Sequence, residues 1–208
     1  MPGIGMIVVT YIMVDNMNIL AKAYNGEISE NEAAYNGGGV FIDGWINQNN
    51  YYKSTFLMKD GIISGNKTTK DGYGGGMSVS QYGIFKMQGG TIKENETLNS
   101  GGGIDLSGSF TMTGGSIVEN TSAYSGGGIY VNPDALIYVS GTPIIKENIG
   151  TEKKSVNNVY LPTDNIIHVI DALEKSANIG VSVGAKDMDH RKIAEGNNPY
   201  TIADGTET

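Results

Sequence analysis

Residues 101–128 decide the fold, and they read GGGIDLSGSFTMTGGSIVENTSAYSGGG. A glycine triplet is followed by Ile104-x-Leu106, then by Phe110-x-Met112, then by an Ile-x-x-Asn segment, and a second triplet closes the stretch. Short runs in which apolar residues alternate with others are typical of β-strands. Runs of three to five residues between glycines are too short for helices. The stretch therefore predicts three short strands in about 25 residues.

The same elements recur along the chain. Successive glycine triplets are 37, 27 and 25 residues apart, and successive Ile-x-x-Asn asparagines are 35, 29, 25 and 28 residues apart. The long first steps indicate an insertion at residues 43–55 in an otherwise regular array. The triplets are Gly37, Gly38, Gly39, Gly74, Gly75, Gly76, Gly101, Gly102, Gly103, Gly126, Gly127 and Gly128. The asparagines are Asn31, Asn66, Asn95, Asn120 and Asn148.

Three short strands per repeat fit one coil of a right-handed parallel β-helix, whose coils stack about 4.8 Å apart. A leucine-rich repeat needs a Leu-x-x-Leu-x-Leu frame, which is missing, and a propeller blade needs about 40 residues. We therefore expect an all-β solenoid of about six to seven coils of roughly 25 residues. Each coil buries little surface alone and is stabilised by its neighbours.

The stacking gives the asparagines and glycines structural roles. In register, the five asparagines are expected to form an inward ladder in which each amide bonds the next coil. The glycines are expected to form the corners, because glycine adopts positive φ angles and permits close backbone approach.

The chain divides into four parts by pattern. We expect a degenerate N-terminal coil at 1–25, regular repeats at 26–150 with the insertion at 43–55, C-terminal coils at 151–185, and a polar, loosely structured end at 186–208. A β-helix exposes open strand edges at its ends unless they are capped, and neither end carries a convincing cap. We therefore expect the segment to belong to a longer chain.

Composition excludes several functions. The 208 residues carry 14 Lys and Arg against 22 Asp and Glu, a net charge of −8, which disfavours a nucleic-acid partner. The chain has no cysteine and only two histidines, so few residues remain for metal binding or catalysis. No apolar run reaches the roughly 18 residues of a membrane span. We therefore expect no cofactor, no metal, no catalytic residue and no membrane insertion by this segment.

The insertion is the best candidate for ligand binding. Trp45, Tyr51 and Tyr52 lie there among asparagines, and exposed aromatic rings suit carbohydrate stacking or a protein interface. The alternative is that these rings fold back as a flap over one face of the tube.

Acidic residues offer weaker hypotheses. Glu30, Glu94, Glu119 and Glu147 each precede a ladder asparagine, and a stripe of them would bind calcium weakly or form a solvated rim. Asp43, Asp105 and Asp134 lie in or near the glycine strand, but singly, whereas glycoside hydrolysis needs a carboxylate pair.

The pairing of Gly-Gly-Gly-Ile with Ile-x-x-Asn over residues 26–183 resembles the repeats of polymorphic outer membrane proteins, which form β-helical autotransporter passengers. It is equally similar to glycine-rich β-helix repeats of large gut-bacterial surface proteins. This chain has Gly for Ala and Ile for Phe in the motifs. The resemblance implies a bacterial surface or secreted, adhesin-like passenger or stalk that binds carbohydrate or protein on a host or neighbouring cell.

Two other classes stay open. One is a carbohydrate-active β-helix enzyme, a polysaccharide lyase or glycoside hydrolase, which would release reducing ends or an unsaturated product. The other is a phage tail protein, which would form a stable trimer.

Overall fold

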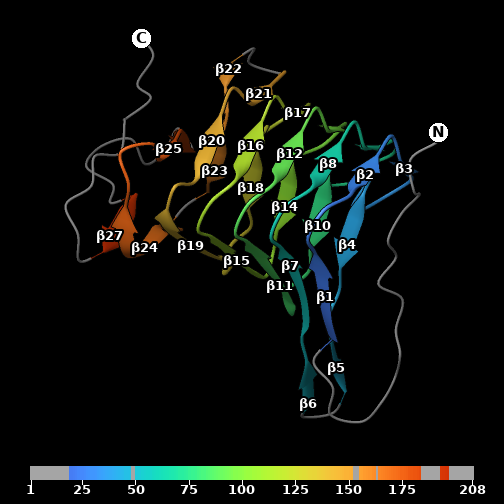
Figure 1. Ribbon diagram of the computed structural model, residues 1–208. Coiled ribbons are helices and arrows are strands. Elements are labelled where there is room, and N and C mark those ends of the chain that lie inside the picture. The colour runs from blue at the N-terminus through green and yellow to red at the C-terminus, as the bar shows by residue number, and fades with distance from the viewer. Residues whose placement is uncertain (1–18, 48–49, 152–154, 163, 184–192, 197–208) are drawn as a thin grey trace.

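The computed structural model describes residues 19–47, 50–151, 155–162, 164–183 and 193–196. It confirms the fold class: the chain is all-β, and its parallel sheets stack as a β-solenoid of about five turns (Figure 1). The described residues contain no helix. The right-handed sense and the exact number of coils stay predictions.

Four sheets run along the solenoid. Sheet A contains β1 (Ile19–Ala23), β7 (Ser54–Met58), β11 (Gly83–Met87), β15 (Ser109–Met112), β19 (Leu136–Gly141), β24 (Ile167–Leu173) and β27 (Ala194–Gly196). Sheet B contains β2 (Glu27–Ser29), β8 (Ile62–Ser64), β12 (Thr91–Lys93), β16 (Ser116–Val118), β20 (Ile144–Lys146) and β25 (Asn178–Ile179).

The other two sheets complete each turn. Sheet C contains β3 (Glu32–Ala33), β9 (Lys67–Thr68), β13 (Glu96–Thr97), β17 (Thr121–Ser122), β21 (Ile149–Gly150) and β22 (Ser155–Val156), the last antiparallel to β21. Sheet D, which follows the glycine triplets, contains β4 (Val40–Ile42), β10 (Met77–Val79), β14 (Ile104–Leu106), β18 (Ile129–Val131), β23 (Val159–Leu161) and β26 (Val181–Val183).

A regular turn therefore has four strands, not the three expected from the sequence. The missed strands are those of sheet C, most of them directly after a ladder asparagine. Each is two residues long, so it cannot show an alternating apolar pattern. In β9, β13 and β17 the buried residue carries a hydroxyl group, and those of Thr68 and Thr97 are hydrogen-bonded to each other at 2.8 Å.

Apolar columns fill the tube. The rings of Phe56, Phe85 and Phe110 stack at centroid distances of 5.7 and 4.9 Å. Register partners in each sheet keep like residues above one another, so Met58 lies beside Met87, which lies beside Met112. Every one of these side chains is at most 3% exposed, and the core is therefore continuous along the axis.

The insertion forms a β-hairpin. Strands β5 (Trp45–Asn47) and β6 (Asn50–Tyr52) pair antiparallel, with Trp45 opposite Tyr52. Figure 1 shows the hairpin projecting away from the body of the solenoid beside β1 and β7. The hairpin therefore does not lie as a flap over a tube face, which was the alternative to ligand binding.

Each end of the described chain adds a strand to sheet A. In the N-terminal part, Ile19–Ala23 pairs with β7, so this stretch adds a full strand to sheet A, whereas residues 1–18 lie outside the described residues. In the C-terminal part expected to be loose, Ala194–Gly196 forms β27 against β24. Ala194 packs against the core there, and Glu195 lies 3.0 Å from His168 Nδ1.

Candidate functional site

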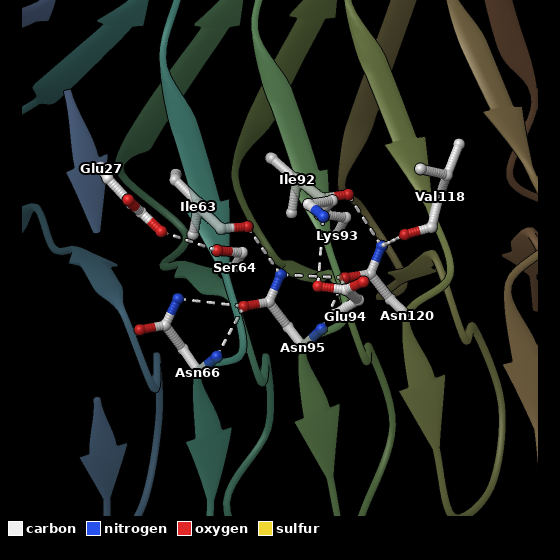
Figure 2. Close-up of polar contacts among 10 residues, drawn as sticks. All are labelled: Glu27, Ile63, Ser64, Asn66, Ile92, Lys93, Glu94, Asn95, Val118 and Asn120. Carbon is white, nitrogen blue, oxygen red and sulfur yellow. Dashed lines mark hydrogen bonds and ion pairs between the residues drawn. The ribbon is translucent and has the colours of Figure 1, made fainter. Parts of the chain in front are cut away.

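The ladder asparagines lie at successive levels inside one corner of the solenoid (Figure 2). Asn66 Nδ2 donates to Asn95 Oδ1 at 3.0 Å, and Asn95 Nδ2 donates to Asn120 Oδ1 at 2.9 Å. At the start of the stack, Asn31 Nδ2 donates to Asn66 Oδ1 at 2.8 Å. Further along, Asn120 Nδ2 donates to Asn148 Oδ1 at 2.9 Å. The structure thus brings all five predicted asparagines together.

Each interior amide is saturated with hydrogen bonds. The Nδ2 group of Asn95 also donates to the Ile63 carbonyl at 3.0 Å, and its Oδ1 also accepts the backbone N–H of Asn66 at 2.9 Å. Because the amide meets donors and acceptors on both neighbouring coils, burial leaves none of its polar atoms unpaired. The ladder is therefore a structural element and offers no group to a ligand.

Sequence reasoning missed a sixth member, Asn158. Its Oδ1 accepts from Asn148 Nδ2 at 3.0 Å and from the Asn148 backbone N–H at 2.9 Å. Asn158 reaches the ladder from sheet D, because its carbonyl accepts from Ile129 as the third glycine of a triplet does in the preceding turns. The available signal was the Asn157-Asn158 pair that stands where a glycine triplet is due.

The three glycines of a triplet have different roles. The first has a positive φ, which is 77° at Gly101. A Cβ on the second, Gly102, would lie 2.4 Å from the Gly127 carbonyl oxygen. A Cβ on the third, Gly103, would lie 3.1 Å from Asn120 Nδ2, so this glycine makes room for the ladder.

The glutamates of the acidic stripe occupy strained backbone positions. Glu30, Glu94, Glu119 and Glu147 have φ between 54° and 59°, where a non-glycine residue costs roughly 1–2 kcal/mol. Lys93 Nζ lies 3.2 Å from Glu94, and Lys146 Nζ lies 2.9 Å from Glu147. Among the residues that the structure describes, no group of three or more His, Asp or Glu side chains is placed to hold a metal ion.

The hairpin separates the three predicted aromatic residues. The rings of Trp45 and Tyr52 stack on each other at 5.1 Å. Tyr51 lies apart from that pair and is 62% exposed, with its ring 5.5 Å from that of Tyr82. Tyr82 lies in the turn between β10 and β11, and sequence reasoning did not select it.

A groove of about 900 Å³ begins at this pair of tyrosines. It follows the corner where the chain passes from sheet D to sheet A, because its walls come from that turn in successive coils. Its lining residues are Asn36, Phe41, Tyr51, Lys53, Ser78, Ser80, Gln81, Tyr82, Gly83, Ile84, Asp105, Ser107, Gly108, Ser109, Asn132, Pro133, Asp134 and Leu136.

Asp105 is the most unusual group in the groove. It is 7% exposed and lies in the outward row of sheet D, between Ser78 and Tyr130. Asn132 Nδ2 donates to its Oδ1 at 2.7 Å, and Ser78 Oγ donates to its Oδ2 at 3.3 Å. Burial raises the pKa of the Asp105 carboxyl above its ordinary value, and these two hydrogen bonds partly oppose that shift.

Tyr130 extends this row. Its ring stacks on that of Tyr160 at 5.6 Å. Burial raises the pKa of the Tyr130 hydroxyl, and Tyr160 and Asp105 raise it further. The outward face of sheet D is thus partly buried and polar at Asp105, and aromatic beyond it.

The aligned repeats contain a sequence pattern that could have indicated this groove. The first residue after each of the strands β4, β10, β14 and β18 is polar, and backbone hydrogen bonds place these residues at equivalent levels. The residues in this column are Asp43, Ser80, Ser107 and Asn132. From the sequence, Asp105 and Asp134 were expected to lie singly, whereas the structure places both in one groove.

No family model matches the chain, and no curated protein or solved structure is similar enough to count as a match. The described part of the chain has no helix that is long and apolar enough to cross a membrane.

Proposed function

We propose that this chain is a non-enzymatic segment of a bacterial surface or secreted protein, an adhesin-like passenger or stalk that binds ligands on a host or neighbouring cell. The observation that carries the proposal is the groove of about 900 Å³ that begins at the hairpin and follows the turns from sheet D to sheet A. Ligand pockets are typically concave and hold a few placed polar groups among apolar ones.

The scaffold supports this role. Its core side chains stack in register along the axis, so the groove walls are held by a rigid frame. The resemblance of the repeats to those of autotransporter passengers agrees with an exported, extracellular location.

Cell binding tests the proposal. Fluorescently labelled protein is incubated with human epithelial cells and with bacterial cells, and bound protein is measured by flow cytometry. We expect saturable binding that the double substitution Tyr51→Ala and Tyr82→Ala removes.

The control is Tyr124→Ala, which removes an exposed tyrosine that does not line the groove. Absence of saturable binding to any cell type contradicts the proposal. If Tyr124→Ala loses as much cell binding as the double variant, the binding site does not lie in the groove.

One observation favours a second candidate, a glycoside hydrolase: Asp105 and Asp134 line the same groove, and burial raises the pKa of Asp105. Such enzymes use a protonated carboxyl as general acid and a second carboxylate as base or nucleophile. Release of reducing ends from a polysaccharide by the wild type, absent in Asp105→Asn, would establish this activity in place of simple binding.

A further inference from the structure

The groove continues along the solenoid axis. A second hollow of about 350 Å³ shares Pro133, Asp134 and Leu136 with it and extends to Asn165 and His168 on the next turn. The walls thus pass through the D-to-A turns near Tyr82, Gly108, Asp134 and Asn165. Three steps of about 4.8 Å separate these levels, which gives a span of about 14 Å.

The chemistry of the walls changes along this path. At the hairpin end, the rings of Tyr51 and Tyr82 present two aromatic surfaces inclined at 53°. In the middle, the Asp105 carboxyl and the Asn132 amide are held together by a 2.7 Å hydrogen bond. A carboxylate has about four acceptor positions, and the bonds from Asn132 and Ser78 use two of them.

This combination suits a sugar. A pyranose ring has an apolar C–H face that packs on an aromatic ring, and hydroxyl groups that donate to carboxylates and amide oxygens. We infer that the groove binds a neutral, linear oligosaccharide laid along the solenoid axis, with one ring against Tyr51 and Tyr82 and another hydrogen-bonded to Asp105 and Asn132. The inference rests on the proposed function and specifies its ligand.

The charges favour a neutral glycan over an acidic one. The groove contains the carboxylates of Asp105 and Asp134 and one cation, Lys53, which lies at the hairpin end. The chain as a whole carries a net charge of −8. A uronate polymer would bring further carboxylates to this surface, and close like charges that are partly desolvated repel strongly.

The axial direction favours a linear chain. Each level contributes a similar turn at a similar height, so the walls repeat at a step close to the size of one sugar ring.

Calorimetric titration of the full chain tests the inference. The probes are cellohexaose and mannohexaose as neutral linear hexamers, and hexagalacturonate as an acidic hexamer of the same length. We expect measurable binding of at least one neutral hexamer and weaker or no binding of hexagalacturonate.

Three variants locate the site. Tyr51→Ala with Tyr82→Ala is expected to weaken binding of the neutral hexamer about tenfold or more, because it removes both stacking surfaces. Asp105→Ala is expected to weaken binding more than Asp105→Asn, which keeps one acceptor oxygen. Tyr124→Ala is the matched control, and circular dichroism verifies that each variant is folded.

The outcomes separate the inference of an oligosaccharide ligand from the proposed function of cell binding. Tighter binding of hexagalacturonate, no binding of either neutral hexamer, or neutral binding that the groove variants leave unchanged would overturn the inference. If labelled protein still binds cells through Tyr51 and Tyr82, and neutral hexamers do not compete, the proposed function stands with a protein ligand. If cell binding is absent as well, the proposed function itself fails.

Discussion

At the scale of single residues, the asparagine ladder illustrates why a polar side chain belongs in this core. Asn95 is 1% exposed, yet its amide joins three consecutive coils through Ile63, Asn66 and Asn120. A leucine of similar volume would fill the space but would remove the acceptor of the Asn66 backbone N–H and the side-chain donor to the Ile63 carbonyl. The unpaired groups decide the outcome, because each buried polar group without a partner costs roughly 1–3 kcal/mol.

Asn95→Leu is therefore expected to lower the free energy of unfolding by at least about 2 kcal/mol. Urea denaturation followed by circular dichroism measures this change. Asn99→Leu is the control, because that side chain makes an exposed hydrogen bond of 3.4 Å to the Asp71 carbonyl, and the substitution should change stability by less than about 0.5 kcal/mol. Equal stability of Asn95→Leu and the wild type would contradict the role of the ladder.

Asp105 has a pH-dependent effect on stability. Burial raises its pKa in the folded state above the ordinary value of 3.8, so folding favours the protonated form. Its contribution to stability is complete below pH 3.8 and declines as the pH rises through the folded-state pKa. At neutral pH the buried, charged Asp105 carboxylate lowers the free energy of unfolding, and a neutral side chain at this position avoids that loss.

Asp105→Asn is therefore expected to raise the melting temperature relative to wild type more at pH 7 than at pH 3. Thermal melts at the two pH values measure the difference, and Asp71→Asn, at an exposed position, is the control. A melting-temperature difference that is the same at both pH values would show that burial of the charge does not affect stability.

At the scale of elements, the hairpin is the part with the least core. It pairs only with itself, and a two-stranded hairpin is marginally stable without additional packing. The stacked rings of Trp45 and Tyr52 and the contact of Tyr51 with Tyr82 supply that packing. Trp45 is also the single tryptophan of the chain, so its fluorescence reports on the hairpin alone.

Tyr52→Ala is expected to shift the Trp45 emission to longer wavelength, because the indole loses its stacking partner and gains water. The far-ultraviolet circular dichroism of the solenoid should stay unchanged. Leu98→Ala, an exposed substitution elsewhere, serves as the control and should alter neither signal. Loss of the β-sheet spectrum in Tyr52→Ala would mean that the hairpin is needed by the whole fold.

The elements also show what the sequence can predict. Strands of sheets A, B and D carry apolar residues at inward positions, and the spacing of these apolar residues predicted the strands. Strands of sheet C have two residues each and bury hydroxyl groups such as those of Thr97 and Ser122, so hydrophobic patterning had nothing to detect. Asn158 escaped for a related reason, since it joins the ladder from a position that glycine occupies in the preceding turns.

At the scale of the whole molecule, the repeat made the solenoid predictable and left the groove unpredictable. Tyr51, Tyr82, Asp105 and Asn132 are far apart in sequence and become neighbours only through stacking and the exit of the hairpin. The repeated motifs allow the register between coils to be predicted from the sequence. The insertion occurs once, so no repeat indicates the direction in which it leaves the solenoid. The sequence indicated Trp45, Tyr51 and Tyr52 as one binding cluster, which stays a prediction, but it did not indicate that Trp45 and Tyr52 stack on each other while Tyr51 contacts Tyr82.

Removal of one complete turn tests the modular character of the solenoid. Deletion of residues 101–125 joins Ser100 to Gly126, which takes the place of Gly101, and brings the next ladder asparagine into line. We expect the shortened chain to keep its β-sheet spectrum and to unfold at a lower urea concentration, because nearest-neighbour interfaces provide the stability.

Deletion of residues 101–112 is the matched comparison. It removes about half a turn and takes the remaining strands out of register, so we expect loss of the β-sheet spectrum. Similar folding of the two deletion variants would contradict the modular description.

The ladder amides all point the same way. From Asn31 through Asn148, each Nδ2 donates to the Oδ1 of the next amide in the ladder, which ends at Asn158. Their dipoles therefore align along the axis and polarise one another. A contact between two molecules that extends this stack has to be head-to-tail, since two like ends would oppose acceptor to acceptor or donor to donor. Head-to-tail contacts of this kind do not close, and translation along a common axis generates a polar filament in place of a symmetric dimer.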